Sequence, residues 1–163
     1  MKRAGLSLEQ ELRRMTLGMS FGASKFFVPT PEFIQWMKRE AGKTLVYDVG
    51  AGAGHVTKAL HDAGIATLGI DLYVHDQPEH PVINADGTAL GYAKGSIVMI
   101  CRPCHGNFAE DVVARAIECG APKVIYVGLV RNVAEDLDEY LLRFKEAGIK
   151  AGRDGEKVWV LNG

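Results

Sequence analysis

Five consecutive residues, Cys101-Arg102-Pro103-Cys104-His105, bring two thiols, a guanidinium and an imidazole together in the sequence. Cys-x-x-Cys-His is the attachment pattern of a c-type haem, and two thiolates with an imidazole are also zinc ligands. In a third interpretation, the stretch forms the floor of a substrate pocket, where Arg102 pairs with a carboxylate or phosphate and His105 acts as a general base. The structural alternative is a packed loop with exposed polar tips.

The surrounding sequence disfavours haem and zinc at this stretch. Residues 96–101, Ser-Ile-Val-Met-Ile-Cys, are almost entirely apolar and predict a buried central strand that includes Cys101. Haem attachment is typical of exported proteins, and the N-terminus lacks the apolar core of a secretory signal. A zinc site needs four ligands, so His75 or His80 would have to join three ligands of which two are adjacent. We therefore expect no metal, and the pocket and the packed loop both stay open.

A second candidate site is the stretch 48–54, Asp-Val-Gly-Ala-Gly-Ala-Gly, between a predicted strand and a predicted helix. Glycines let the backbone turn tightly and let a ligand approach closely, and the following helix directs unpaired N–H groups at that ligand. The dinucleotide pattern G-x-G-x-x-G is not met, because its third glycine falls on His55 or Thr57. Asp71 ends the next predicted strand and Asp86 follows the one after it, so acids lie at three successive strands.

An acid followed by G-x-G-x-G, with acids at the next two strands, resembles the class I methyltransferases, which bind S-adenosylmethionine. The resemblance covers residues 44–163. It implies that Asp71 accepts hydrogen bonds from the ribose hydroxyls, that Leu72 packs on the adenine, and that Asp86 and the backbone N–H of Gly87 recognise the adenine edge. The other implied cofactor contacts are Asp48, Gly50, Ala51, Gly52, Gly54 and Cys101.

The end of the fourth predicted strand departs from the pattern of the amino-group methyltransferases. Those enzymes carry Asp/Asn-Pro-Pro-aromatic there, whereas residues 101–105 keep one proline and lack the acid and the aromatic residue. We therefore expect methyl transfer to a small molecule, with Arg102 and His105 as catalytic residues suited to a substrate with an acidic group and a protonated nucleophile. The alternative is a non-catalytic module that binds S-adenosylmethionine and serves a partner protein.

The elements expected to position these residues form a doubly wound α/β sheet of seven mostly parallel strands, because short apolar runs alternate with helical patterns. An antiparallel hairpin around Asp154-Gly155 closes this Rossmann-like arrangement. The strands are expected at 44–50, 66–71, 81–86, 96–101, 122–130, 149–153 and 157–162, and the helices at 53–63, 108–119 and 133–147.

Two connections are short for parallel crossovers. Only residues 72–81 link the second and third strands, and only residues 87–95 link the third and fourth, whereas a crossover usually needs a dozen or more residues with a helix. We expect both helices to be truncated to turns, which leaves one face of the sheet thinly covered. Such a face favours a homodimer or a partner protein, through Tyr73–Pro81 and Leu90–Lys94.

The chain divides into an N-terminal helical segment, 1–43, and the cofactor-binding domain, 44–163. Helices are expected at 7–17 and at 30–41, where Thr30-Pro31 reads as an N-cap followed by the first helical residue. The segment would serve as a lid or a cap.

Charge and cysteine content exclude some function classes. With 19 basic and 20 acidic residues among 163, the net charge is -1, which does not favour nucleic-acid binding. No apolar run reaches the length of a membrane span, and three cysteines do not make a disulfide framework. We therefore expect a cytoplasmic protein with reduced thiols.

Overall fold

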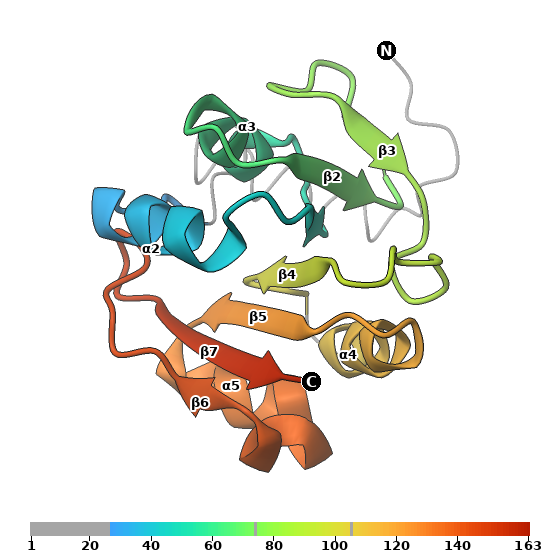
Figure 1. Ribbon diagram of the computed structural model, residues 1–163, viewed down its shortest axis with the longest axis vertical. Coiled ribbons are helices and arrows are strands. Elements are labelled where there is room, and N and C mark those ends of the chain that lie inside the picture. The colour runs from blue at the N-terminus through green and yellow to red at the C-terminus, as the bar shows by residue number, and fades with distance from the viewer. Residues whose placement is uncertain (1–26, 74, 105) are drawn as a thin grey trace.

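The central feature of the protein is one seven-stranded sheet with the strand order β3-β2-β1-β4-β5-β7-β6 (Figure 1). The computed structural model describes residues 27–73, 75–104 and 106–163. The five strands β1 to β5 run parallel, and β7 is antiparallel to both β5 and β6, which confirms the predicted sheet and its closing hairpin. The strands are β1 Val46–Val49, β2 Thr67–Asp71, β3 Val82–Asn84, β4 Ile97–Cys101, β5 Lys123–Gly128, β6 Lys145–Glu146 and β7 Lys157–Asn162.

Helices cover both faces of the sheet. Alternate residues of β4 point to opposite faces, so Ile97 and Met99 pack with helices α2 and α3, whereas Val98 and Ile100 pack with helices α4 and α5. This burial on both sides explains why the central strands are almost entirely apolar. Within the described ranges, no helix has the length and apolarity needed to cross a membrane. The helices are α2 Pro31–Ala41, α3 His55–Asp62, α4 Phe108–Glu118 and α5 Val130–Leu137.

Helix α2 begins as its sequence predicts. The Thr30 hydroxyl accepts a hydrogen bond from the N–H of Phe33 at 3.1 Å, and Pro31 occupies the first helical position. Phe33 and Met37 are fully buried against the sheet. This part of the N-terminal segment is therefore part of the hydrophobic core, while the helix expected at 7–17 lies outside the described residues.

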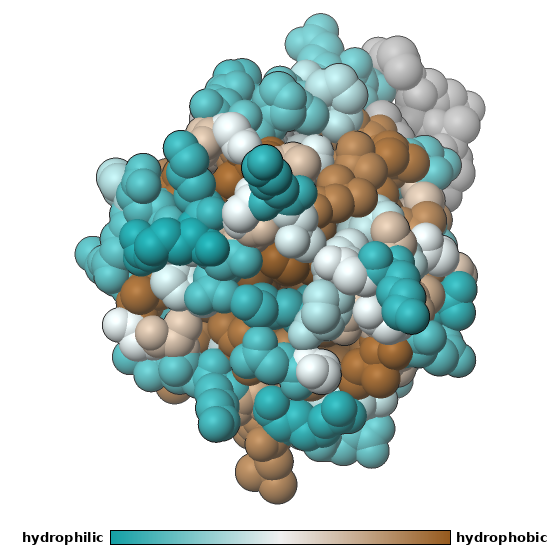
Figure 2. All heavy atoms as spheres, in the orientation of Figure 1, coloured by the Kyte–Doolittle hydropathy of each residue, from teal (hydrophilic) through white to brown (hydrophobic). Residues whose placement is uncertain are grey.

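The predicted truncation of two crossovers is confirmed for the residues that the structure describes. No helix lies between β2 and β3 or between β3 and β4. Leu68 of β2 and Ile83 of β3 consequently stay 38% and 46% exposed, and Figure 2 shows apolar atoms at the surface over this end of the sheet. One edge of the sheet thus has an apolar surface that no helix of the described residues covers.

The prediction for residues 133–147 was wrong. Helix α5 ends at Leu137, a 3-10 helix follows over Asp138–Arg143, and β6 then begins at Lys145. Asp138 breaks the helix with a φ of 42° and a ψ of -116°, a combination that is uncommon for a residue with a Cβ. The apolar spacing was misleading because Phe144 reaches the core from extended backbone.

The first strand of the closing hairpin was also placed wrongly. Residues 149–153 do not pair with β7; Lys145 and Glu146 do, opposite Val160 and Trp159. Gly152 instead forms an isolated antiparallel bridge with Pro29, and the N–H of Thr30 donates to the carbonyl of Ala151 at 2.8 Å. The connection between β6 and β7 is therefore joined to the segment that precedes α2.

Candidate functional site

The glycine-rich turn joins β1 to α3 at the carboxyl edge of the sheet. Gly50, Gly52 and Gly54 have φ values of 78°, 59° and 83°, which other residues adopt only with strain. A Cβ at Gly52 would meet nothing closer than His75 Nε2, 3.9 Å away, so space lies open above the middle of the turn. The three glycines thus form a tight turn, called the glycine cradle below, with open space beside Gly52.

Asp48 lies at the end of β1, just before this cradle, and contacts the helix that follows it. Its Oδ2 accepts a hydrogen bond from the Thr57 hydroxyl at 2.7 Å. The N-cap residue, Gly54, has no side chain to serve as a cap, so the Asp48 carboxylate supplies negative charge near the first turn of α3. Burial raises the pKa of Asp48 to about 6, against the opposing effect of the hydrogen bonds from Thr57.

Asp71, the last residue of β2, is tied to the cradle. Its Oδ2 accepts from the N–H of Gly52 at 2.8 Å, and its Oδ1 accepts from the N–H of Tyr73 at 2.9 Å. A carboxylate oxygen has two lone pairs, so each oxygen can accept a further hydrogen bond. Leu72, next to this carboxylate, is 52% exposed and offers an apolar surface beside it.

Asp86 follows β3 and lies exposed in a turn. Its Oδ1 accepts from both the N–H and the hydroxyl of Thr88, at 2.9 and 2.7 Å, and these hydrogen bonds lower its pKa. The adjacent Gly87 is held from below because the Tyr92 hydroxyl donates to its carbonyl at 2.6 Å. A Cβ at Gly87 would lie 2.4 Å from Val49, so this backbone rests directly on the sheet.

The fourth strand ends at Cys101, which is half-buried, while Cys104 is exposed. Burial raises the pKa of the Cys101 thiol well above its ordinary value, and the negative charges of Asp48 and Glu156 raise it further. The thiol therefore stays protonated at neutral pH and is not an activated nucleophile.

Arg102 follows Cys101 in a strained conformation with a φ of 43°. Its guanidinium Nη1 lies 3.5 Å from Oε2 of Glu156 and 3.9 Å from Oδ2 of Asp154. His105, the other predicted catalytic residue, lies outside the described residues. The structure thus places Arg102 at the expected edge, beside carboxylates from the β6–β7 connection.

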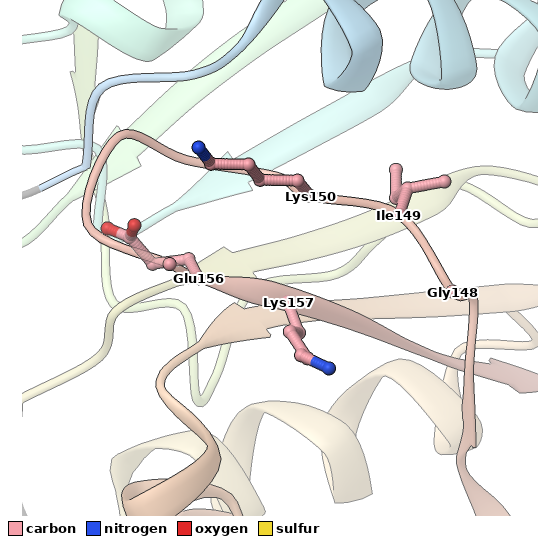
Figure 3. A pocket seen from close by; sticks show the side chains of 6 residues that line it. Gly148, Ile149, Lys150, Glu156 and Lys157 are labelled. Atoms are coloured by element: carbon pink, nitrogen blue, oxygen red, sulfur yellow. The ribbon is translucent and has the colours of Figure 1, made fainter.

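Two further features bear on the alternatives. Among the described residues, no group of three or more histidine, cysteine, aspartate or glutamate side chains could hold a metal ion. A cavity of about 310 Å³ lies in the β6–β7 connection, and none of the predicted site residues lines it (Figure 3). The cavity is therefore separate from the glycine cradle; its lining residues are Gly148, Ile149, Lys150, Gly155, Glu156 and Lys157.

Sequence analysis missed three residues that support the site: Thr57, Tyr92 and Glu156. Thr57 lies in the first turn of the helix after the cradle, where a hydroxyl can reach back to the acid of β1. Glu156 immediately precedes β7, an antiparallel strand whose beginning lies level with the end of β5. An acid at that position was a signal for the carboxyl edge, whereas nothing in the sequence marks the contact of Tyr92.

The comparisons with known proteins rest on structure. No protein-family model matches the sequence, and a search of the curated proteins gives no match. A 1,6-didemethyltoxoflavin-N1-methyltransferase of Burkholderia thailandensis, solved with S-adenosylhomocysteine, is similar with a TM-score of 0.58 at 15% identity, over 98% of this chain and 91% of that one. The magnesium protoporphyrin IX methyltransferase of Synechocystis PCC 6803, with bound SAM, gives a TM-score of 0.57 at 14% identity, over 98% and 85%.

An rRNA enzyme shares the same architecture. The 23S rRNA methyltransferase ErmE gives a TM-score of 0.54 at 14% identity, over 83% of this chain and 69% of that one. At such identities the likeness concerns the fold, and these similar structures differ in what they act on. The chain therefore has the Rossmann-like fold of the class I S-adenosylmethionine-dependent methyltransferases.

Proposed function

We propose that the protein is a transferase, an S-adenosylmethionine-dependent methyltransferase that acts on a small molecule in the cytoplasm. The observation that carries this proposal is the hydrogen bond from the N–H of Gly52 to Asp71. It joins the glycine cradle to the acid of the next strand at the carboxyl edge, where open α/β sheets bind their ligands. The segment 1–43 is proposed as a lid or cap over the domain 44–163.

The described residues would divide the cofactor between them. Each oxygen of Asp71 accepts one backbone hydrogen bond and could accept another from a ribose hydroxyl, and the exposed Leu72 could pack on the adenine ring. Asp86, kept ionised by Thr88, can accept from the exocyclic amine, and the Gly87 N–H can donate to the ring. The methionine end is proposed to be held by Asp48, Gly50, Ala51, Gly52, Gly54 and Cys101.

Catalysis would depend mainly on alignment. When bound, S-adenosylmethionine supplies a methyl group that its sulfonium already activates, so the protein has to position an acceptor and remove its proton. His105 is proposed as the group that takes this proton, and Arg102 as the group that orients the acceptor. An acidic group of the acceptor would be a further anion beside Arg102, in addition to Glu156 and Asp154.

Calorimetric titration tests cofactor binding. The protein is expected to bind S-adenosylmethionine and S-adenosylhomocysteine, and Asp71→Ala is expected to weaken both by about tenfold or more, the scale of a lost charged hydrogen bond. Asp62→Ala, which removes an exposed carboxylate of α3 paired with Lys58, is the matched control and should bind normally. Tight binding of NAD with no response to either compound would overturn the proposal.

The non-catalytic module is the second candidate. It is favoured by the missing acid and aromatic residue after β4 and by the apolar surface at Leu68 and Ile83, which suits a partner. Methyl-donor consumption separates the two candidates. Cofactor binding that does not change in Arg102→Ala and His105→Ala, with no consumption of the methyl donor, would support the module and contradict the enzyme.

A further inference from the structure

Glu156 is a fully buried carboxylate at the edge of the sheet that carries the candidate site. It has no exposed surface, although an ionised carboxylate is costly to remove from water without a partner. It immediately precedes β7, and the register pairs Lys157 of β7 with Gly128 at the end of β5. Figure 3 shows the side chains of Glu156 and Lys157 pointing in opposite directions.

The partners of Glu156 come from two segments. Its Oε2 lies 3.5 Å from Nη1 of Arg102, and its Oε1 accepts a hydrogen bond from the N–H of Asp154 at 2.9 Å. The carboxylate of Asp154 adds a second negative charge 3.9 Å from the same Nη1. The end of β4 and the β6–β7 connection are thus joined through one guanidinium.

Arg102 is held in place from its backbone as well. Its φ of 43° is uncommon for a residue with a Cβ, and its N–H donates to the carbonyl of Val127 at 2.7 Å. Strained residues of this kind persist where their surroundings fix them, and they gather at ligand sites. The ion pair and the backbone hydrogen bond together fix Arg102 next to Cys101, at the end of β4.

The position of Arg102 matters because its guanidinium carries a positive charge. Ile100 of β4 pairs with Val49 of β1, the residue directly before Gly50, so Cys101 and Arg102 follow β4 beside the glycine-rich turn. The negative charges of Asp48 and Glu156 also raise the pKa of the Cys101 thiol, after the larger effect of burial. In the proposed cofactor site, Arg102 is therefore assigned to the methionine end. An uncompensated guanidinium there would repel the sulfonium of the methyl donor, which is also a cation.

We infer that Glu156 is a positioning and charge-compensating residue, which holds Arg102 at the end of β4 and cancels its charge so that the site accepts a sulfonium cation. This inference rests on the proposed binding of S-adenosylmethionine.

Two ligands that differ by a methyl group and one positive charge test the inference. S-adenosylmethionine carries the sulfonium charge and S-adenosylhomocysteine does not, so the ratio of their dissociation constants reports the charge near the sulfur. In Glu156→Gln, the affinity for S-adenosylmethionine is expected to fall by about fivefold relative to the affinity for S-adenosylhomocysteine. This is the scale that Coulomb's law gives for unit charges about 10 Å apart at an effective dielectric constant of about 40.

Two further variants fix the sign of the effect. Arg102→Gln leaves the carboxylates uncompensated, so the ratio should move in the opposite direction and favour S-adenosylmethionine. The double variant Arg102→Gln/Glu156→Gln should return the ratio to that of the unaltered protein. Glu146→Gln, which removes an exposed carboxylate of β6 paired with Lys157, is the control and should leave the ratio unchanged.

The possible outcomes separate the inference from the proposed function. If Glu156→Gln weakens the binding of both ligands equally, its role is purely structural and the inference is overturned. The inference is also overturned if the variant changes the binding of neither ligand. If Glu156→Gln does not fold, the sign of the change in Arg102→Gln decides. Failure of the unaltered protein to bind either ligand would overturn the proposed function itself.

Discussion

Asp48 accepts a hydrogen bond from Thr57 at 2.7 Å while both side chains are almost completely buried between β1 and α3. The contact joins the strand before the glycine cradle to the helix after it. Gly69 of β2 packs against the same hydroxyl, since a Cβ there would lie 2.7 Å from Thr57 Oγ1. The cradle is therefore held from below by a polar contact that has little access to water.

The buried Asp48 predicts an unusual dependence of stability on pH. Its pKa of about 6 in the folded protein exceeds the ordinary value near 4, so the folded state binds the extra proton between these values. The free energy of unfolding should therefore fall as the pH rises from about 4 through 6. Asp48→Asn removes this effect and should gain up to about 3 kcal/mol relative to the unaltered protein between pH 4 and pH 7.

Denaturant unfolding at several pH values checks this prediction. Asp62→Asn is the matched control, because Lys58 lowers the pKa of this exposed carboxyl, so its pH-dependent effect has the opposite sign and falls mainly below about pH 4. A difference between Asp48→Asn and the unaltered protein that stays constant from pH 4 to pH 7 would contradict the prediction.

A side chain at Gly87 should destabilise the protein. In Gly87→Ala the new Cβ would lie 2.4 Å from Val49 Cγ1 and 3.2 Å from the Tyr92 hydroxyl, so the backbone after β3 must move. Overpacking of this kind costs about 1–3 kcal/mol of unfolding free energy. Thermal unfolding measures the effect, and Gly91→Ala in the same connection, where a Cβ meets nothing within 4 Å, should be nearly neutral. Equal stability of the two variants would refute the packing argument.

The sequence was sufficient to predict the sheet and the cradle because both depend on local patterns. Buried parallel strands require apolar runs, and the left-handed turns at Gly50 and Gly52 require glycine, so each leaves a signal in the sequence. The position of Asp71 at the carboxyl end of β2 could be predicted for the same reason, since this residue directly ends an apolar strand. Contacts between neighbouring strands then follow from the topology.

The features that could not be predicted depend on distant contacts or on a single backbone angle. The helix ends near Leu137 because Asp138 adopts a positive φ, and neither glycine nor proline marks that position. Glu156 follows the Asp154-Gly155 turn signal, so the sequence could indicate its place near the carboxyl edge but not its proximity to Arg102, which gives it a role. Such pairings depend on how the β6–β7 connection folds back, which periodicity does not report.

The Tyr92 hydroxyl should stabilise both the fold and the adenine end of the site. Tyr92→Phe removes the hydrogen bond to the Gly87 carbonyl, which should cost about 1–3 kcal/mol of unfolding free energy. The variant should also bind S-adenosylhomocysteine more weakly, because the turn that holds Asp86 is loosened. Tyr126→Phe removes a comparably buried hydrogen bond, to Asp136 at 2.5 Å, and is the control that should lose stability without losing affinity. If both variants bind the ligand equally well, Tyr92 has no role in recognition.

The uncovered end of the sheet predicts self-association. Leu68 and Ile83 are exposed on neighbouring strands where no crossover helix covers them, and β3 is an edge strand whose backbone can accept a second strand. We expect a homodimer through this face that dissociates in Leu68→Gln/Ile83→Gln, because two apolar contacts are lost from each copy. Sedimentation velocity over a range of concentrations measures the change.

Leu142→Gln is the control variant. It removes an apolar side chain that is 96% exposed in the 3-10 helix, so it should leave the association unchanged. A monomer at every concentration would show that this face serves no second copy of the chain.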